Sequence, residues 1–92
     1  MIVLQDTTNQ EGVRIIYAKP DGVCSQQIGV AVKDGIILEV AFMGGCSGNT
    51  QGVASLAKGM NVKEAASRLK GINCAGKGTS CPDQLSSVLE LF

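Results

Sequence analysis

The sequence predicts an α+β fold in which a three-stranded antiparallel sheet is covered on one face by three helices. Two observations favour this class. Apolar residues alternate with a period of two in the first half of the 92-residue chain, and they recur with the period of an α-helix in the second half. A run of strands followed by a run of helices is typical of helices packed on one face of an antiparallel sheet. The length is that of one domain, residues 1–92, with a single modest core.

The strands are expected in the first half. Residues 1–12 are polar and weakly patterned, and they fit either a strand or an arm. Residues 14–19 have the composition of a strand and end at a Pro-Asp-Gly breaker. Alternation resumes on both sides of Asp34-Gly35, a strong hairpin signal, and predicts a hairpin over residues 26–43. Its two strands should each place one set of apolar residues on a single face: Ile28, Val30 and Val32, and then Ile36, Leu38, Val40 and Phe42.

Three amphipathic helices are expected in the second half. The first spans about residues 47–59, and the second begins at Asn61, which can form a capping box with Glu64. Gly71 suits the position after the end of the second helix, and Pro82 suits the first turn of the third. The residues expected on the buried faces are Val53, Leu56, Ala57 and Met60, then Val62, Ala65, Ala66 and Leu69, and finally Leu85, Val88, Leu89 and Phe92.

The composition excludes several classes of function. The formal net charge is zero and there is no basic run, so nucleic acid is not an expected partner. No stretch approaches the roughly 20 apolar residues of a membrane helix, and the N-terminus lacks the features of a signal peptide. We therefore expect no membrane partner and a cytoplasmic location. The chain has no histidine and no paired carboxylates, so acid–base or hydrolytic catalysis of its own has no support.

Four cysteines carry the chemistry: Cys24, Cys46, Cys74 and Cys81. Each lies in a turn or at the end of a predicted element, where thiols can converge on one point. Cys46 and Cys81 each precede or begin a helix, whose unpaired N–H groups and dipole stabilise the thiolate that binds metal. In a reducing cytoplasm, four cysteines are more often ligands or redox groups than two disulfides. Their spacing, C-x21-C-x27-C-x6-C, matches no zinc-finger or ferredoxin pattern, so spacing alone leaves metal binding and unpaired thiols about level.

The segment from Thr79 to Leu85, Thr-Ser-Cys-Pro-Asp-Gln-Leu, resembles the signature of the TSCPD-domain family. The other cysteines fall where the small four-cysteine, stand-alone branch of that family has them, and the resemblance covers residues 22–92. In that family the domain is also appended to the C-termini of some ribonucleotide reductases. The resemblance therefore implies a role accessory to ribonucleotide reduction, with a reductase as partner. Any enzyme label would come from that association.

A second resemblance is to U-type iron–sulfur scaffold proteins. It is carried by Gly-Val-Cys at residues 22–24, by Gly-Gly-Cys-Ser at 44–47, and by Leu-Ala-Lys-Gly-Met-Asn-Val-Lys-Glu-Ala at 56–65. In order along the chain, the three cysteines that match the cluster ligands of those proteins are Cys24, Cys46 and Cys81. The resemblance implies the scaffold fold, an Fe–S cluster and cluster-assembly proteins as partners.

The chain also departs from the scaffold pattern. An acidic residue follows the first cysteine in scaffolds, where this chain has Ser25 and Gln26. Ser80 replaces the scaffold histidine before the last cysteine, and Cys74 has no scaffold counterpart. Four cysteines suit tight retention better than transfer, so we favour a tetrathiolate site for Zn²⁺ or an Fe–S cluster. An excess of cations over residues 47–80 could offset its negative charge, although solvated helix faces explain the same lysines.

Three further hypotheses stay open at this point. The stretch from Gly71 to Gly78 fits G-x-x-x-x-G-K but has glycine where a phosphate loop needs Ser or Thr, and it follows a helix. An NTPase is therefore not expected, although Lys77 could still contact a phosphate or a nucleotide. Alternatively, Cys74 and Cys81 could cycle between dithiol and disulfide as a redox partner of a reductase. The remaining alternative is a metal-free interaction module whose cysteines only pack.

Overall fold

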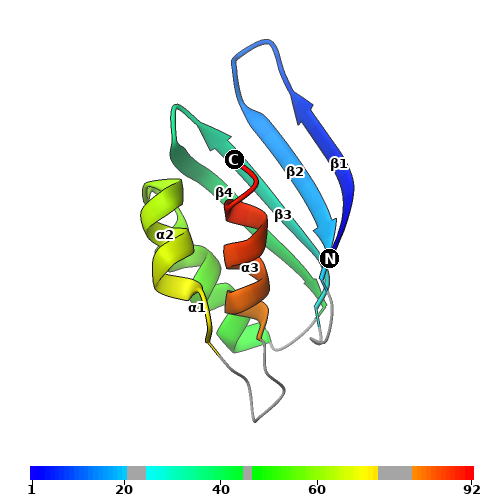
Figure 1. The fold of residues 1–92 in the computed structure, drawn as a ribbon, viewed down its shortest axis with the longest axis vertical. Coiled ribbons are helices and arrows are strands. Elements are labelled where there is room, and N and C mark those ends of the chain that lie inside the picture. The colour runs from blue at the N-terminus through cyan, green and yellow to red at the C-terminus, as the bar shows by residue number, and fades with distance from the viewer. Residues whose placement is uncertain (21–24, 45–46, 73–79) are drawn as a thin grey trace.

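The computed structural model describes residues 1–20, 25–44, 47–72 and 80–92. Four strands come first along the chain and three helices follow (Figure 1). The strands are β1 (Ile2–Thr8), β2 (Arg14–Lys19), β3 (Ser25–Lys33) and β4 (Ile36–Gly44), and the helices are α1 (Ser47–Ala57), α2 (Val62–Leu69) and α3 (Cys81–Leu89). Neighbouring strands are antiparallel in the order β1-β2-β3-β4. The α+β class is confirmed, but the described part of the sheet has four strands rather than the predicted three.

The additional strand, β1, has no hydrophobic pattern. All 7 of its residues are exposed. Backbone pairing with β2 holds it in place from Ile2 to Thr8, with a bulge between Val3 and Gln5. A strand that buries neither face has no reason to alternate apolar and polar residues, so sequence could not distinguish it from an arm. The prediction of three strands was wrong for this reason.

An ion pair joins β1 to β2. The Arg14 guanidinium donates from Nε and Nη2 to the two carboxylate oxygens of Asp6, at 2.9 and 2.7 Å. The same guanidinium lies 5.4 Å from the ring centre of Phe92, a cation–π contact that brings the end of the chain to the sheet. The hydrogen bond from Arg14 holds the pKa of the Asp6 carboxyl below its ordinary value.

Arg14→Ala is expected to raise the pKa of Asp6 toward its ordinary value of 3.8, because the hydrogen bond that favours the carboxylate is lost. A carboxyl whose pKa is lowered by folding stabilises the protein above its unfolded pKa. That contribution disappears as the pH falls through the folded pKa. The free energy of unfolding of the variant should therefore depend less on pH than that of the wild type, and only in the acid range. NMR titration of the Asp6 carboxyl carbon measures the shift. An unchanged midpoint would show that the ion pair does not form in solution.

The predicted hairpin between β3 and β4 is confirmed. Its turn residues, Asp34 and Gly35, have φ angles of 52° and 76°. Positive φ at both central positions is the requirement of a type I′ turn, whose twist matches that of the flanking strands. The Asp-Gly pair therefore fixes the register of the hairpin. As predicted, Ile28, Val30 and Val32 share one face of β3, and all three are buried.

The buried face of β4 differs from the prediction. Ala31 pairs with Glu39, whereas Val32 pairs with Ile37, so Leu38 is the extra residue of a bulge. Ile37 is fully buried, while Ile36 and Leu38 are 38% and 39% exposed. The prediction that Ile36 and Leu38 share a buried face with Val40 was wrong, because strict alternation cannot anticipate an inserted residue.

The connection between α1 and α2 pairs with the start of β4. Gly59 N–H donates to the Ile37 carbonyl at 2.7 Å, and Ile37 N–H donates to the Met60 carbonyl at 2.9 Å. Val62 N–H then donates to the Gly35 carbonyl at 2.9 Å. These bonds satisfy backbone groups of an edge strand and fix α2 relative to the sheet.

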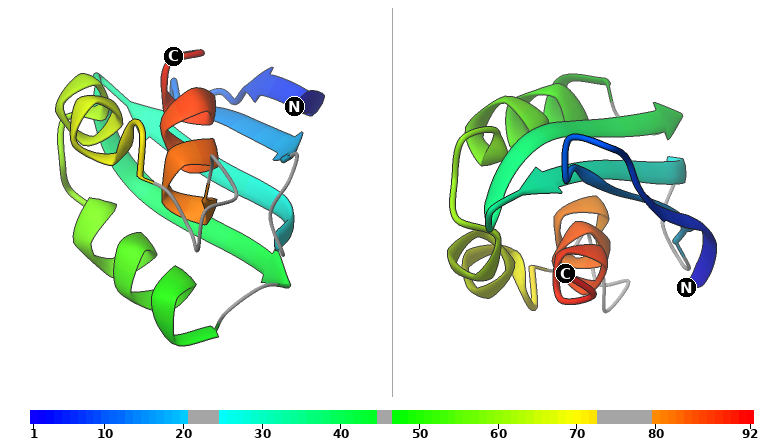
Figure 2. Two further views of the ribbon diagram at one scale, coloured as in Figure 1. Left: turned by 60° about the horizontal axis from the view of Figure 1, so that its bottom comes forward. Right: turned by 90° about the horizontal axis from the view of Figure 1, so that it is seen from above.

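All three helices contribute to one hydrophobic core with one face of the sheet. Helices α2 and α3 lie side by side over that face, and α1 runs along β4 (Figures 1 and 2). Of the expected residues, Leu85, Val88 and Leu89 in α3 and Val62, Ala65 and Ala66 in α2 are buried, whereas Leu69 and Phe92 are partly buried against the core. The prediction for Leu56 in α1 was wrong: it is 77% exposed, because the helix turns Val53, Ala54 and Ala57 toward the core instead. Within the described ranges, no helix has the length and apolarity needed to span a membrane.

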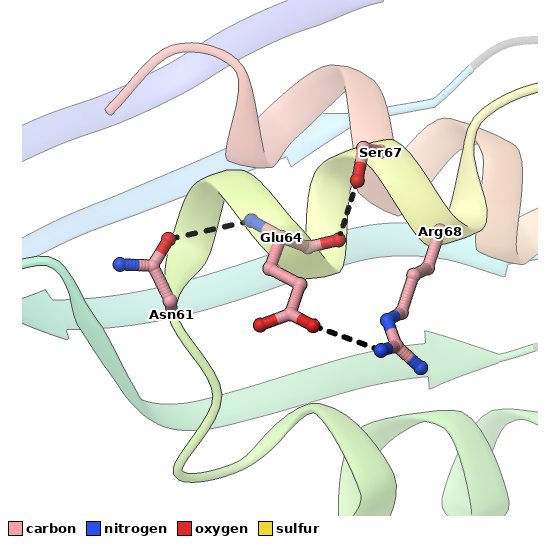
Figure 3. Close-up of polar contacts among 4 residues, drawn as sticks. All are labelled: Asn61, Glu64, Ser67 and Arg68. Carbon is pink, nitrogen blue, oxygen red and sulfur yellow. Dashed lines mark hydrogen bonds and ion pairs between the residues drawn. The ribbon is translucent and has the colours of Figure 1, made fainter.

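Asn61 is the N-cap of α2, as predicted. Its side-chain oxygen accepts hydrogen bonds from the N–H of Lys63 at 2.9 Å and from the N–H of Glu64 at 3.3 Å, the second of which is drawn in Figure 3. The carboxylate of Glu64 pairs with Arg68 one turn further along, at 2.8 Å, instead of completing the capping box. Ser67 donates its hydroxyl to the Glu64 carbonyl (Figure 3). At the other end, Gly71 has a φ of 82°, which suits the position after the helix.

Asn61→Ala is expected to lower the free energy of unfolding by about 1 kcal/mol, because two N–H groups of the first turn lose their acceptor. Asn61→Asp keeps the acceptor and should restore most of the loss. Ser67→Ala, which removes an exposed hydroxyl from the same helix, should change stability by less than about 0.5 kcal/mol. Urea denaturation of the three variants measures these differences. Equal losses in Asn61→Ala and Ser67→Ala would contradict the assignment of the cap.

Candidate functional site

Of the residues that the sequence singles out as a site, the structure describes Cys81. It is the first residue of α3 and is 6% exposed, so its predicted place at a helix N-terminus is confirmed. Cys24, Cys46, Cys74 and Lys77 lie outside the described residues. Within the described ranges, no three His, Cys, Asp or Glu side chains lie close enough together to hold a metal ion. The four-cysteine site therefore stays a prediction.

The described neighbours of the four cysteines lie at one end of the molecule. Ser25, the residue after Cys24, pairs with Gly44 across the end of the β3–β4 hairpin. Cys46 follows Gly44 by two residues and directly precedes α1. The start of β3, the end of β4 and the starts of α1 and α3 all lie toward the lower end of Figure 1, and the views in Figure 2 agree.

Two hydrogen bonds tie the start of α3 to the residues after α2, and a third caps α3 itself. Ser80 donates its hydroxyl to the Ile72 carbonyl at 2.6 Å and accepts the N–H of Asp83 at 3.1 Å, so it is also the N-cap of α3. The Asp83 carboxylate accepts the N–H of Gly71 at 2.7 Å. We call these four residues the α2–α3 bracket: Gly71, Ile72, Ser80 and Asp83. In sequence, Cys81 lies between two bracket residues, the N-cap Ser80 and Asp83 in the first turn of α3.

The sequence reasoning missed the roles of Ser80 and Asp83. A Ser-x-x-Asp pattern ahead of an apolar run is a known signal for a helix N-terminus and could have identified Ser80 as the cap. The bond from Gly71 to Asp83 joins residues 12 apart and follows no local rule. A second hydroxyl, that of Ser86, also joins α3 to α2, by donating to the Ala66 carbonyl at 2.7 Å in the core.

Three of the described cations of the helical half have carboxylate partners. The pairs are Lys58 with Glu39 at 3.5 Å, Arg68 with Glu64 at 2.8 Å, and Lys70 with Glu90 at 3.8 Å. The side chains of these three cations are 60%, 69% and 71% exposed. Exposed ion pairs of this kind contribute little stability and are typical of solvated helix faces. They give no support to the idea that these cations offset the charge of a metal–thiolate centre.

The first turn of α3 has few N–H groups to offer an anion. The N–H of Asp83 donates to the Ser80 hydroxyl, and the N–H of Gln84 donates to the Ser80 carbonyl at 2.8 Å. Pro82 has no N–H. A phosphate held at a helix N-terminus needs several such donors directed at it. This turn therefore favours a structural use of its amides over phosphate binding.

Comparison with known proteins identifies the family. No curated protein matches the chain, and no solved structure does. The likeness to U-type scaffolds therefore stays a prediction. The TSCPD-domain family matches over residues 6–92, which take in the sheet from Asp6 onward and all three helices. The match includes the motif whose Ser80 and Asp83 form the bracket and whose Cys81 is buried at the start of α3. The chain belongs to the TSCPD-domain family.

Proposed function

We propose that this chain holds Zn²⁺ or an Fe–S cluster through its four cysteines, in a role accessory to ribonucleotide reduction or to metal-cluster handling. The ligands would be Cys24, Cys46, Cys74 and Cys81. The observation that supports this most is that the described residues nearest in sequence to each of the four lie at one end of the fold (Figure 1). Four thiolates suit a tetrahedral Zn²⁺ and equally suit an Fe–S cluster.

Chain connectivity supports the proposal at two places. At the sheet, Cys24 is bonded to Ser25, which pairs with Gly44, two residues before Cys46. At the helices, Cys74 follows Ile72 by two residues, and the Ile72 carbonyl accepts a hydrogen bond from the neighbour of Cys81. Two residues reach at most about 7 Å. Each pair of cysteines is therefore attached to backbone that is already close together.

The use of Ser80 supports a site made of thiolates alone. In U-type scaffolds a histidine precedes the last cysteine, whereas here Ser80 takes that position and is 3% exposed. Its hydroxyl is committed to the Ile72 carbonyl and to the N–H of Asp83. The position therefore serves to cap α3, and Cys74 would supply the additional ligand.

Anaerobic purification followed by metal and acid-labile sulfide analysis tests the proposal. We expect either one Zn per chain without sulfide, or stoichiometric Fe with sulfide. The visible spectrum separates the two, because Fe–S clusters absorb strongly there and zinc thiolates do not. Cys81→Ser should lose the metal, whereas Ser87→Ala, on the same helix, should keep it. Substoichiometric Zn and Fe in the wild-type protein would end the proposal.

A second candidate function is thiol–disulfide exchange by Cys74 and Cys81. The hydrogen bond between Ser80 and Ile72 favours it, because it joins the flanks of these two cysteines. Oxidation of the two thiols would release two electrons and two protons, which would reduce a disulfide of the partner reductase. Titration of thiols across a series of redox buffers tests this. Four thiols that stay reduced at cytosolic potentials would exclude it.

The phosphate hypothesis for Lys77 has less support. It relies on N–H groups leading into α3, and those of Asp83 and Gln84 donate to Ser80. A nucleotide titration monitored by NMR would revive this hypothesis if it shifted resonances of the α3 first turn.

A further inference from the structure

We propose that Ser80 and Asp83 are positioning residues for Cys81: the α2–α3 bracket holds the first turn of α3, and the thiol it carries, at a fixed place beside the end of α2. The importance of that placement rests on the proposed function, in which Cys81 is a ligand. The bracket itself lies wholly within the described residues and depends on three hydrogen bonds of 2.6 to 3.1 Å.

Ser80 uses its hydroxyl in both directions. The O–H donates to the Ile72 carbonyl, and the oxygen accepts the N–H of Asp83. The residue is 3% exposed, so water cannot readily replace either partner. Substitution by alanine would remove the hydroxyl that donates to the Ile72 carbonyl and the oxygen that accepts the N–H of Asp83. Threonine keeps a hydroxyl at the same place.

Asp83 adds a second attachment. Its carboxylate accepts the N–H of Gly71, which lies just past the end of α2 with a φ of 82°. That backbone conformation is open to glycine without strain, and it directs the chain away from the helix axis. The two attachments fall on consecutive residues, Gly71 and Ile72. Together they fix both the distance and the direction of the first turn of α3.

Ser86 provides a matched control. It too is buried, at 1% exposed, and its hydroxyl donates to a carbonyl of α2, that of Ala66, at 2.7 Å. Like Ser80, Ser86 therefore donates a hydroxyl to a backbone carbonyl on the α2 side. It lies more than one turn beyond Cys81 along α3. A purely structural role for Ser80 predicts that the two serines behave alike. A positioning role predicts that only Ser80 affects Cys81.

The test is the rate at which iodoacetamide alkylates Cys81 in the reduced, metal-free protein, measured peptide by peptide with mass spectrometry. A buried thiol reacts through local opening. We expect Ser80→Ala to speed the reaction at Cys81 about tenfold, because the cap and its buried bond are both lost. Ser80→Thr should restore the wild-type rate. Asp83→Asn should react at close to the wild-type rate, because its amide oxygen still accepts the N–H of Gly71. Ser86→Ala should react at the wild-type rate. Equal acceleration by Ser80→Ala and Ser86→Ala would overturn the positioning role.

A Co²⁺ titration of the same variants separates this inference from the proposed function. Thiolate-to-cobalt charge-transfer absorption should show weaker binding in Ser80→Ala and wild-type binding in Ser80→Thr and Ser86→Ala. If the wild-type protein takes up no Co²⁺ and holds no stoichiometric Fe with sulfide, the proposed function fails, while selective alkylation in Ser80→Ala still supports the bracket. Unchanged Co²⁺ affinity in Ser80→Ala, with binding intact in the wild type, would overturn the inference alone.

Discussion

Leu85→Ala is expected to lower the free energy of unfolding by about 3 kcal/mol, whereas Leu56→Ala should lower it by less than about 0.5 kcal/mol. Both leucines were predicted to lie on the buried face of a helix. In the structure Leu85 is fully buried and Leu56 is 77% exposed. The same substitution therefore removes well-packed atoms at one position and solvated atoms at the other.

The cost at Leu85 has two parts. The variant loses the free energy gained when the removed methine and two methyl groups leave water on folding, and the surrounding core closes the cavity incompletely. Val88 and Leu89 of the same helix are also buried, so little nearby is able to move in. Urea denaturation gives the free energies, and equal slopes in both variants would show that the denatured state is unchanged. Losses of similar size at the two positions would contradict the orientation of α1.

The parts of the fold that sequence could predict are those whose signals are local. Asp34-Gly35 dictates the hairpin turn because both residues adopt positive φ. Asn61 predicts the start of α2 because its side chain bonds the next N–H groups. The buried face of α3 consists of large apolar residues that recur with the period of an α-helix. In each case the chemistry within a few residues decides the structure.

The errors have a common physical cause: they depend on pairing and packing partners that lie outside the segment itself. β1 is a strand because β2 pairs with it and Arg14 binds Asp6, and neither fact leaves a pattern in residues 1–12. The bulge at Leu38 depends on how β4 pairs with β3. In α1, the choice of Ala54 over Leu56 as a core residue depends on the room that the other elements leave. Periodicity contains none of this information.

For the candidate site, sequence predicted that Cys81 begins a helix, and the structure confirms this. Sequence could not reveal the α2–α3 bracket, because the bond between Gly71 and Asp83 forms only after the two helices have packed. The reverse holds for the cations: their excess is visible in sequence, but pairing of Lys58 with Glu39 and of Lys70 with Glu90 is not. A count of charges over residues 47–80 therefore overestimates the positive charge that could act on a metal site.

Removal of the metal that we propose the four cysteines hold is expected to lower the stability of the wild-type protein by about 4 kcal/mol when the free metal concentration is 1,000 times its Kd. Binding to the folded state alone adds to the free energy of unfolding, and ligands drawn from separate elements exist as a site only after folding. Thermal or urea unfolding with and without a strong chelator measures the difference. A purely packing role for the cysteines predicts no effect of the chelator.

Cys81→Ser makes this prediction specific to the site. In metal-free protein the substitution replaces one small buried side chain with another, and it should cost about 1 kcal/mol. In the presence of metal it should cost several times more, because the variant also loses the binding contribution. The difference between the losses of unfolding free energy with and without metal is the stabilisation that depends on Cys81 as a ligand. The effect of the substitution on packing is the same in both and cancels. A variant that loses the same amount with and without metal would remove Cys81 from the site and leave it as a core residue at the start of α3.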